Sequence, residues 1–138
     1  MPRKRKNQET FTTFRCAVYT RVNVGASLHT LRLQRKAIHA FLTSQKSRGW
    51  VRLTPTYEDV RQSAGHLRRP ALQSLLADID AGKVDCAVVY DLSRLTRSHS
   101  DQEELFARFC NAGVALVTVC PKFFYDLGTK VESVGIAK

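Results

Sequence analysis

Four arginines beside apolar runs of the sequence could together form a binding site for a phosphate group. Arg21 closes the first apolar run, and Arg69 precedes a helical pattern. Arg94 and Arg97 follow another apolar run. A guanidinium group stays charged at neutral pH, and its planar set of donors matches phosphate oxygens. Each arginine alone could be a solvated surface charge, but four at one place would repel one another, which would indicate an anionic ligand.

The charge of the whole chain points to the same kind of partner. Its 138 residues carry a formal net charge of +10, and the sequence pI is about 9.9. Residues 1–6 include four basic side chains, yet a clear positive excess remains without them. Such an excess favours nucleic acid as the partner, and the alternative is a basic soluble protein without one.

Several other classes of protein are disfavoured. No apolar run is long enough to span a membrane and no signal segment follows the basic start, so we expect a cytoplasmic protein without a membrane partner. No glycine-rich nucleotide-binding loop follows an apolar run, and the cysteines and histidines lack zinc-ligand spacing. We therefore expect no cofactor and no metal, and we expect four buried thiols in a reducing compartment: Cys16, Cys86, Cys110 and Cys120.

The elements that must position these arginines follow from the apolar pattern. Four apolar runs rich in β-forming residues predict strands: Arg15–Thr20, Val51–Glu58, Val84–Tyr90 and Val114–Val119. Between them, helical spacing predicts a helix up to about Arg48, one that starts at Pro70 and stops before Gly82, and one from a capping box at Ser100–Glu103 to Gly113.

This alternation predicts an α/β fold with a central, mostly parallel four-stranded sheet and helices on both faces. Sites in such sheets form at the carboxyl ends of strands, which is where the arginines fall. We expect a basic flexible arm at 1–13, a domain at 14–125 and an atypical C-terminal segment at 126–138.

Six short motifs, in order from about Phe14 to Phe124, resemble the N-terminal catalytic domain of serine recombinases, the resolvase/invertase family. Each motif alone is weak, but six in register are specific. Val18–Val22 resembles the family opening Y-A/T-R-V-S, and Gly113-Val114 before a valine-rich strand also fits. The other four are Leu33–Ile38 (LQRKAI), Tyr57–Leu72 (YED…SAG…LRRPAL), Ala81–Asp85 (AGKVD) and Tyr90–Ser98 (YDLSRLTRS).

The resemblance implies DNA recombination chemistry. In this family a serine hydroxyl attacks the scissile phosphate of DNA and forms a phosphoserine link, while arginines stabilise the charge on the phosphoryl group. Resolution, inversion, integration in mobile elements and transposition all remain open. Carried over by position, the arginine cluster is Arg21, Arg69, Arg94 and Arg97, the supporting polar residues are Gln34, Asp59 and Ser63, and Tyr19 lies near the nucleophile.

Two positions depart from the family pattern. The nucleophile position holds Asn23, whose amide cannot accept a phosphoryl group, so we expect a catalytically impaired protein. Ser27 is a poor substitute because it lies four residues away from the expected clamp. The family's aspartate beside the arginine is Ser93 here, which should loosen Arg94, and Asp91 lies two positions earlier.

Two functions from different classes follow. Residues 126–138 lack the long apolar helix that leads into the family's DNA-binding part, so we expect a truncated, degenerate or engineered recombinase domain. The first hypothesis is a DNA-binding serine recombinase domain that is enzymatic by descent and inactive as written, possible as a homo-oligomer. The alternative is a non-catalytic basic module that binds DNA or a full-length recombinase. A covalent protein–DNA adduct would distinguish the first from the second.

Overall fold

The computed structural model describes residues 13–23, 25–61, 65 and 67–127. Residues 1–12 of the predicted arm, Ser63 and most of the atypical C-terminal segment therefore lie outside the described residues. The strands are β1 (Phe14–Val22), β2 (Trp50–Arg52), β3 (Tyr57–Val60), β4 (Cys86–Val89), β5 (Ala115–Val119) and β6 (Lys122–Tyr125). The helices are α1 (Leu28–Ser44), α2 (Pro70–Asp80) and α3 (His99–Ala112), with short 3-10 turns η1 (Lys46–Arg48) and η2 (Leu92–Arg94).

One mixed sheet organises the chain, in the order β2-β1-β4-β5-β6, with β3 also paired to β1. All pairs are parallel except β5 with β6. The amino half of β1 pairs with β2 and its carboxyl half pairs with β3, so β2 and β3 together occupy one neighbouring position. The predicted fold class, a mostly parallel sheet in an α/β domain, is confirmed.

The predicted count of four strands is wrong in two places. The run Val51–Glu58 forms two strands, because the chain between Arg52 and Tyr57 contains Pro55, which has no amide hydrogen for a strand ladder. β6 was also missed. It is a four-residue antiparallel edge strand of mixed exposure, so it lacks the continuous apolar run that marks the inner strands.

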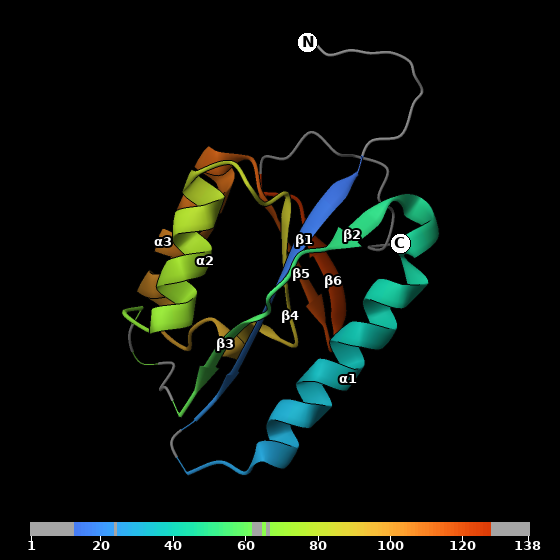
Figure 1. Cartoon of the computed structure of the whole chain (residues 1–138). Helices are drawn as coiled ribbons and strands as arrows, with labels where there is room; N and C mark the ends of the chain where they lie inside the picture. Colours follow the sequence, from blue (N-terminus) through green and yellow to red (C-terminus); the bar gives the residue numbers. More distant parts are fainter. Residues whose placement is uncertain (1–12, 24, 62–64, 66, 128–138) are drawn as a thin grey trace, which may run out of the picture.

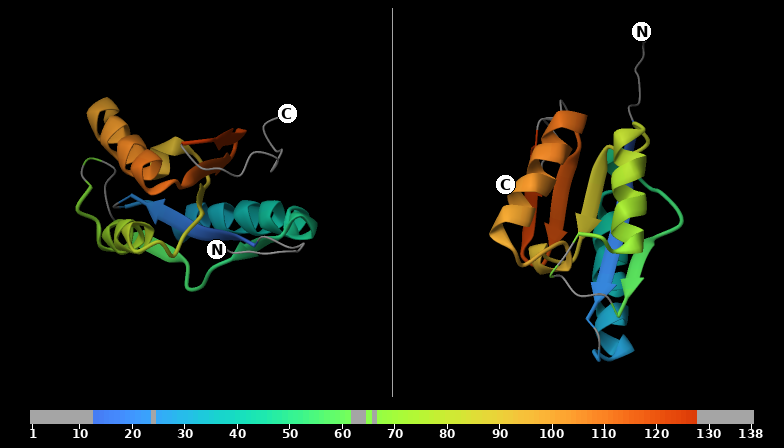
Figure 2. Two further views of the ribbon diagram at one scale, coloured as in Figure 1. Left: turned by 90° about the horizontal axis from the view of Figure 1, so that it is seen from above. Right: turned by 90° about the vertical axis from the view of Figure 1, so that its left-hand side faces the viewer.

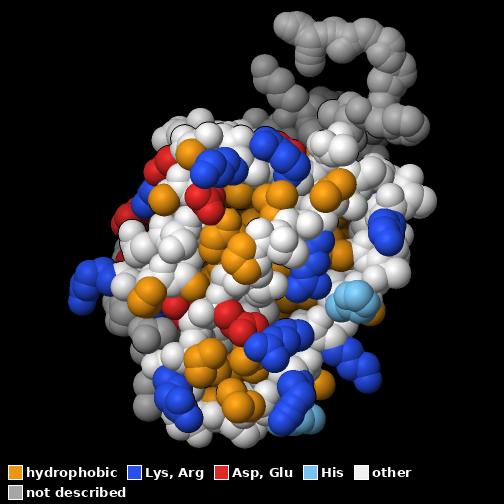
Figure 3. Space-filling view, viewed as in Figure 1, with side chains coloured by type: hydrophobic (Ala, Val, Ile, Leu, Met, Phe, Trp, Pro, Cys, Tyr) orange, Lys and Arg blue, Asp and Glu red, His pale blue; other side chains and the backbone are white. Residues whose placement is uncertain are grey.

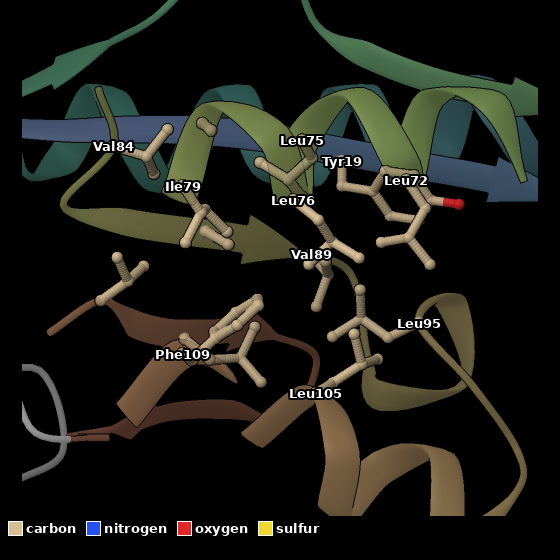
Figure 4. Close-up of a cluster of buried hydrophobic side chains, with 14 residues drawn as sticks. Tyr19, Leu72, Leu75, Leu76, Ile79, Val84, Val89, Leu95, Leu105 and Phe109 are labelled. Atoms are coloured by element: carbon tan, nitrogen blue, oxygen red, sulfur yellow. The ribbon is translucent and has the colours of Figure 1, made fainter. Parts of the chain in front are cut away.

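The helices cover both faces of the sheet, α1 on one side and α2 with α3 on the other (Figures 1 and 2). Between the sheet and α2 and α3 lies one apolar core, in which Leu72, Leu76 and Phe109 pack against Tyr19 and Val89 (Figure 4). A second core lies under α1. It includes Ile38 and Phe41 from α1 and Trp50 from β2.

The helix ends follow local chemistry. Gly113 ends α3 in the left-handed conformation, and Gly82 at φ 76° follows the end of α2, as the sequence predicts. The N-cap of α3 is Ser98, whose hydroxyl accepts a hydrogen bond from the Asp101 amide. The N-cap therefore lies two residues before the predicted Ser100. The acidic residue at the N3 position is Asp101 and not the predicted Glu103.

The expectation of four buried thiols holds for two of them. Cys16 and Cys86 are buried side by side on β1 and β4. Cys110 and Cys120 are exposed, because Cys110 lies on the outward side of α3 and Cys120 lies in the turn after β5. Among the described residues, no group of metal-binding side chains gathers that could hold a metal ion, and no helix could cross a membrane.

Candidate functional site

The order of the strands determines where a site can form. From β1 the chain crosses over α1 to β2 and β3 on one side, and from β3 it crosses over α2 to β4 on the other side. The carboxyl ends of β1 and β4 therefore flank the point where the chain reverses its direction of winding, and ligands of α/β sheets bind at such points. Arg21 and Asn23 lie at the end of β1, and η2 brings Ser93 and Arg94 next to them.

Arg21 is fully buried, and its guanidinium group donates to both segments. Nε donates to the Arg94 carbonyl at 2.9 Å, and Nη2 donates to the Ser93 carbonyl at 2.8 Å. Nη1 donates to Oδ1 of Asn23 at 2.5 Å. The predicted nucleophile position thus lies in direct contact with the first arginine of the cluster, and it presents an amide there.

Arg69 and Arg94 complete the cluster. Arg69, the N-cap residue of α2, is fully buried, donates to the carbonyls of Arg94 and Leu95, and lies over the Tyr19 ring at 5.8 Å. Arg94 donates to the Arg21 carbonyl at 3.0 Å, and its side chain is 12% exposed. Its Nε is buried without a hydrogen-bond partner, although it lies 3.5 Å from a carboxylate oxygen of Asp91. That separation is an ion-pair contact rather than an aligned hydrogen bond.

The arginine side chains of the cluster lie close enough to repel one another. Burial, followed by the charges of Arg94 and Arg69, lowers the pKa of Arg21 to about 10. The charge of Arg97, which is exposed, is a smaller cause of the same shift. Burial also lowers the pKa of Arg69. Both groups remain cationic at neutral pH, so an anion that entered the cluster would relieve their mutual repulsion.

Three polar side chains support the cluster from below. Gln34 of α1 binds both backbone groups of Arg21: its Oε1 accepts from the amide at 3.2 Å, and its Nε2 donates to the carbonyl at 2.8 Å. The hydroxyl of Tyr19 donates to Asp59 at 2.7 Å, and burial together with this bond raises the pKa of Tyr19. Asp59 also accepts from the amides of Ala71 and Leu72, so it fixes the first turn of α2, where Arg69 lies.

The two serines that the sequence raised lie in different surroundings. The Ser93 hydroxyl donates to Asp91 and accepts from Nη2 of Arg94 at 3.0 Å, so it links the carboxylate to the arginine. Ser27 is the exposed N-cap residue of α1, and its side chain makes no capping bond. Ser63, which the resemblance also carried over, lies outside the described residues.

The backbone of η2 was missed as part of the site. The carbonyls of Ser93, Arg94 and Leu95 accept from Arg21 and Arg69, and they hold both guanidinium groups in place. A search for chemical side chains could not find them, since any residue type offers a carbonyl. The one usable signal was the polar break after the apolar run of β4.

Comparisons with known proteins agree with this geometry. The family model "Resolvase, N terminal domain" matches residues 16–134. The chain is similar to the N-terminal catalytic domain of TP901-1 integrase, with 31% identity, a TM-score of 0.66 and coverage of 80% of each chain. No curated protein sequence matches. The chain belongs to the resolvase N-terminal domain family, the catalytic domain of the serine recombinases.

Two more distant structures share the fold. The C-terminal catalytic domain of ISC1926 TnpA, an IS607-like serine recombinase, is 23% identical, with a TM-score of 0.67 and coverage of 77% of this chain and 70% of that one. A resolvase family site-specific recombinase from Streptococcus pneumoniae is also 23% identical, with a TM-score of 0.67 and coverage of 81% and 76%.

Proposed function

We propose that this domain binds a backbone phosphate of DNA in the cluster of Arg21, Arg69 and Arg94, and that it does so without forming a phosphoserine link. The observation that carries the proposal is that three nearly or fully buried guanidinium groups gather where the end of β1 meets η2, and that one of them, Arg21, contacts Asn23. Buried cations are normally paired with an anion. Here much of their hydrogen bonding goes to carbonyl groups, which carry no net charge.

Phosphate fits this arrangement better than a carboxylate does. Phosphate oxygens can accept from several guanidinium groups at once, and the clustered arginines approach from β1, α2 and η2. Exposed Arg97 offers a further cation at the rim of the cluster. Within the family such a cluster stabilises charge on a phosphoryl group, and here we assign it to ground-state binding.

DNA is the favoured source of that phosphate. The chain carries a net charge of +10, which promotes binding to any polyanionic backbone. Its relatives include an integrase and site-specific recombinases, whose names describe proteins that act on DNA.

Asn23 is the reason for proposing binding without covalent chemistry. A nucleophile at this position would need a hydroxyl or a thiol, and an amide nitrogen is delocalised and unreactive towards phosphate. Its oxygen already accepts from Arg21. We assign the amide NH₂ of Asn23 to a hydrogen bond with a phosphate oxygen, which a bound but uncleaved strand would accept.

Fluorescence anisotropy with a labelled short duplex tests the proposal. Arg94→Ala removes a cluster guanidinium and should weaken binding about tenfold, because charge-assisted hydrogen bonds are lost. The control is Arg108→Ala on α3, which removes the same charge from an exposed pair with Asp80. We expect this control to weaken binding less than about twofold. Equal effects of the two variants would show that the cluster is not the phosphate site.

A further inference from the structure

A small groove lies beside the arginine cluster, at the carboxyl end of β3 and the start of α1. It has a volume of about 350 Å³ and is lined by Leu28, Leu31, Arg32, Arg35, Val60 and Arg61. Its floor is apolar and its rim is cationic. Figure 3 shows apolar side chains flanked by Lys or Arg side chains over this end of the molecule. A groove of this size suits a small group with a flat apolar face.

The apolar floor of the groove is open to solvent. Leu28 is 52% exposed and Val60 is 37% exposed, and they belong to the few large apolar side chains that the described surface leaves open. Covering exposed apolar area of this kind with a ligand lowers the free energy, so it favours binding.

The rim of the groove carries an excess of positive charge. Arg35 is neutralised by Glu58, with two hydrogen bonds of 2.8 Å and 2.6 Å. Within the described part of the chain, neither Arg32 nor Arg61 forms an ion pair. The first turn of α1, which begins at Leu28, holds no acidic residue, so the positive end of that helix adds to the field.

Arg61 also has an unusual backbone. It has φ 62° and is the one non-glycine residue with positive φ among those the structure describes. A long side chain rarely adopts this conformation, and such strain is often found at binding sites. The conformation places an arginine directly at the end of β3, against the groove.

The groove and the arginine cluster belong to the same edge of the sheet. Val60 is the parallel neighbour of Val22, and Asp59 is the neighbour of Arg21. Because side chains alternate along a strand, Asp59 points towards α2 and the cluster, while Glu58 and Val60 point towards α1. The two sites therefore lie on opposite faces of the carboxyl edge, one backbone layer apart.

We propose that this groove binds an unpaired nucleotide that flanks the phosphate held in the cluster. Its base packs on Leu28 and Val60, and its phosphate lies between Arg32 and Arg61. The proposal rests on the proposed function, because the strand must reach the groove over the edge of β1 and β3. Single-stranded nucleic acid binds without sequence preference in positively charged grooves, where arginine adds cation–π contacts to the bases, and apolar side chains such as Leu28 and Val60 gain from being covered.

Charge argues against a second copy of this chain as the occupant. Each copy carries a net charge of +10, so a like-charged surface would have to approach Arg32 and Arg61, for which the described residues provide no ion pair. A nucleotide brings both an apolar face and a negative charge, in the arrangement that the floor and the rim offer.

The test compares two single-stranded oligonucleotides of equal length, one with bases and one with a run of abasic sites. The full chain should bind the base-bearing strand more tightly, since the two strands have equal numbers of phosphates. Leu28→Ser should reduce its affinity for the base-bearing strand about three- to tenfold and leave its affinity for the abasic strand unchanged. The matched control is Leu33→Ser, also on α1, where Leu33 is 49% exposed and lies outside the groove.

A second variant tests the rim and does not depend on the apolar floor. Arg61→Asn removes the charge and keeps a residue that tolerates positive φ. It should weaken binding of both strands and lower the salt slope by about one.

Three results would overturn the proposal: equal affinity for the two strands, equal effects of Leu28→Ser and Leu33→Ser, or a Leu28→Ser variant that changes only self-association in light scattering. The proposed function fails separately, if Arg94→Ala leaves duplex binding intact.

Discussion

Two arginines on the same strand show what distinguishes a structural cation from a binding one. Arg15, at the amino end of β1, forms a salt bridge with Asp85 and makes hydrogen bonds to both carboxylate oxygens, and the pair is partly exposed. The hydrogen bonds to Asp85 raise the pKa of Arg15. Arg21, at the carboxyl end, is buried beside other arginines, and its pKa is lowered to about 10.

The difference lies in the partner rather than in the residue type. A carboxylate gives Arg15 a complete ion pair within the fold, and this ion pair stabilises the contact between β1 and the start of β4. Arg21 donates to carbonyl groups and has cationic neighbours that lower its pKa, so a bound anion would stabilise its charged form. An arginine whose pKa is lowered within a cluster is therefore a candidate for ligand binding.

The largest expected effect concerns Asn23, which contacts Arg21. The unmodified chain should give no covalent adduct with labelled DNA on a denaturing gel, because no hydroxyl lies in the cluster at this position. Asn23→Ala should also give none. Asn23→Ser should give at most a trace of adduct, and Ser93→Asp added to it should increase the yield. An adduct from the unmodified chain that maps to Ser27 would contradict this prediction.

The next largest effect concerns Asp59, the carboxylate that supports the cluster from below. Asp59→Ala removes three hydrogen bonds, from Tyr19 and from two amides of α2, and should lower the free energy of unfolding by about 3 kcal/mol. Asp80→Ala, at the exposed end of the same helix, should cost less than about 0.5 kcal/mol. Urea denaturation measures both values, and similar losses would mean that Asp59 is not structural.

Removing each kind of arginine should change stability in opposite directions. Arg15→Met breaks an ion pair and should lower the free energy of unfolding by about 1 kcal/mol, a value reduced for partial exposure. Arg94→Met removes the 3.5 Å contact with Asp91 but also relieves repulsion within the cluster, so it should leave stability unchanged or raise it by up to about 1 kcal/mol. The Arg21 carbonyl keeps its bond from Gln34 in that variant. A clear loss of stability in Arg94→Met would refute the comparison of Arg15 with Arg21.

The smallest expected effect is the pH dependence of the stabilisation that a second ion pair, Arg35 with Glu58, gives to the fold. Hydrogen bonds from Arg35 and then Thr20 lower the pKa of Glu58 below its ordinary value of 4.5, although burial opposes them. The folded state therefore binds this proton less tightly than the unfolded state does, and the stabilisation is present above pH 4.5 and lost as the pH falls. Glu58→Gln should cost about 0.5 kcal/mol at pH 7, and this cost should shrink as the pH falls below 4.5. A constant difference across this range would exclude the ion pair as its source.

The sequence predicts the inner strands and the cluster because both depend on local pattern. β1, β4 and β5 are continuous apolar runs. Arg21 and Arg94 are predicted from their places at or after the ends of β1 and β4, and Arg69 is predicted from its place before α2. The break at Pro55 and the edge strand β6 were missed because a half-exposed strand has no distinctive apolar pattern.

Other features depend on three-dimensional neighbours that no spacing reveals. Gln34 makes two hydrogen bonds to the backbone of Arg21, and these require α1 to pass the end of β1 in one particular position. The carbonyl contacts of η2 depend on how the chain turns after β4. Exposure of Cys110 depends on which side of α3 faces the sheet.

The pairing of β1 has a consequence for local opening of the fold. β1 has β4 on one side and β2 and β3 on the other, whereas β3 has one described neighbour. In native-state hydrogen exchange, the amides in the middle of β1 should therefore exchange only through global unfolding, while those of β3 exchange through a smaller opening. The arginine cluster is built at the end of the most protected segment. The groove at Val60 lies on β3, whose amides we expect to be less protected than those of β1.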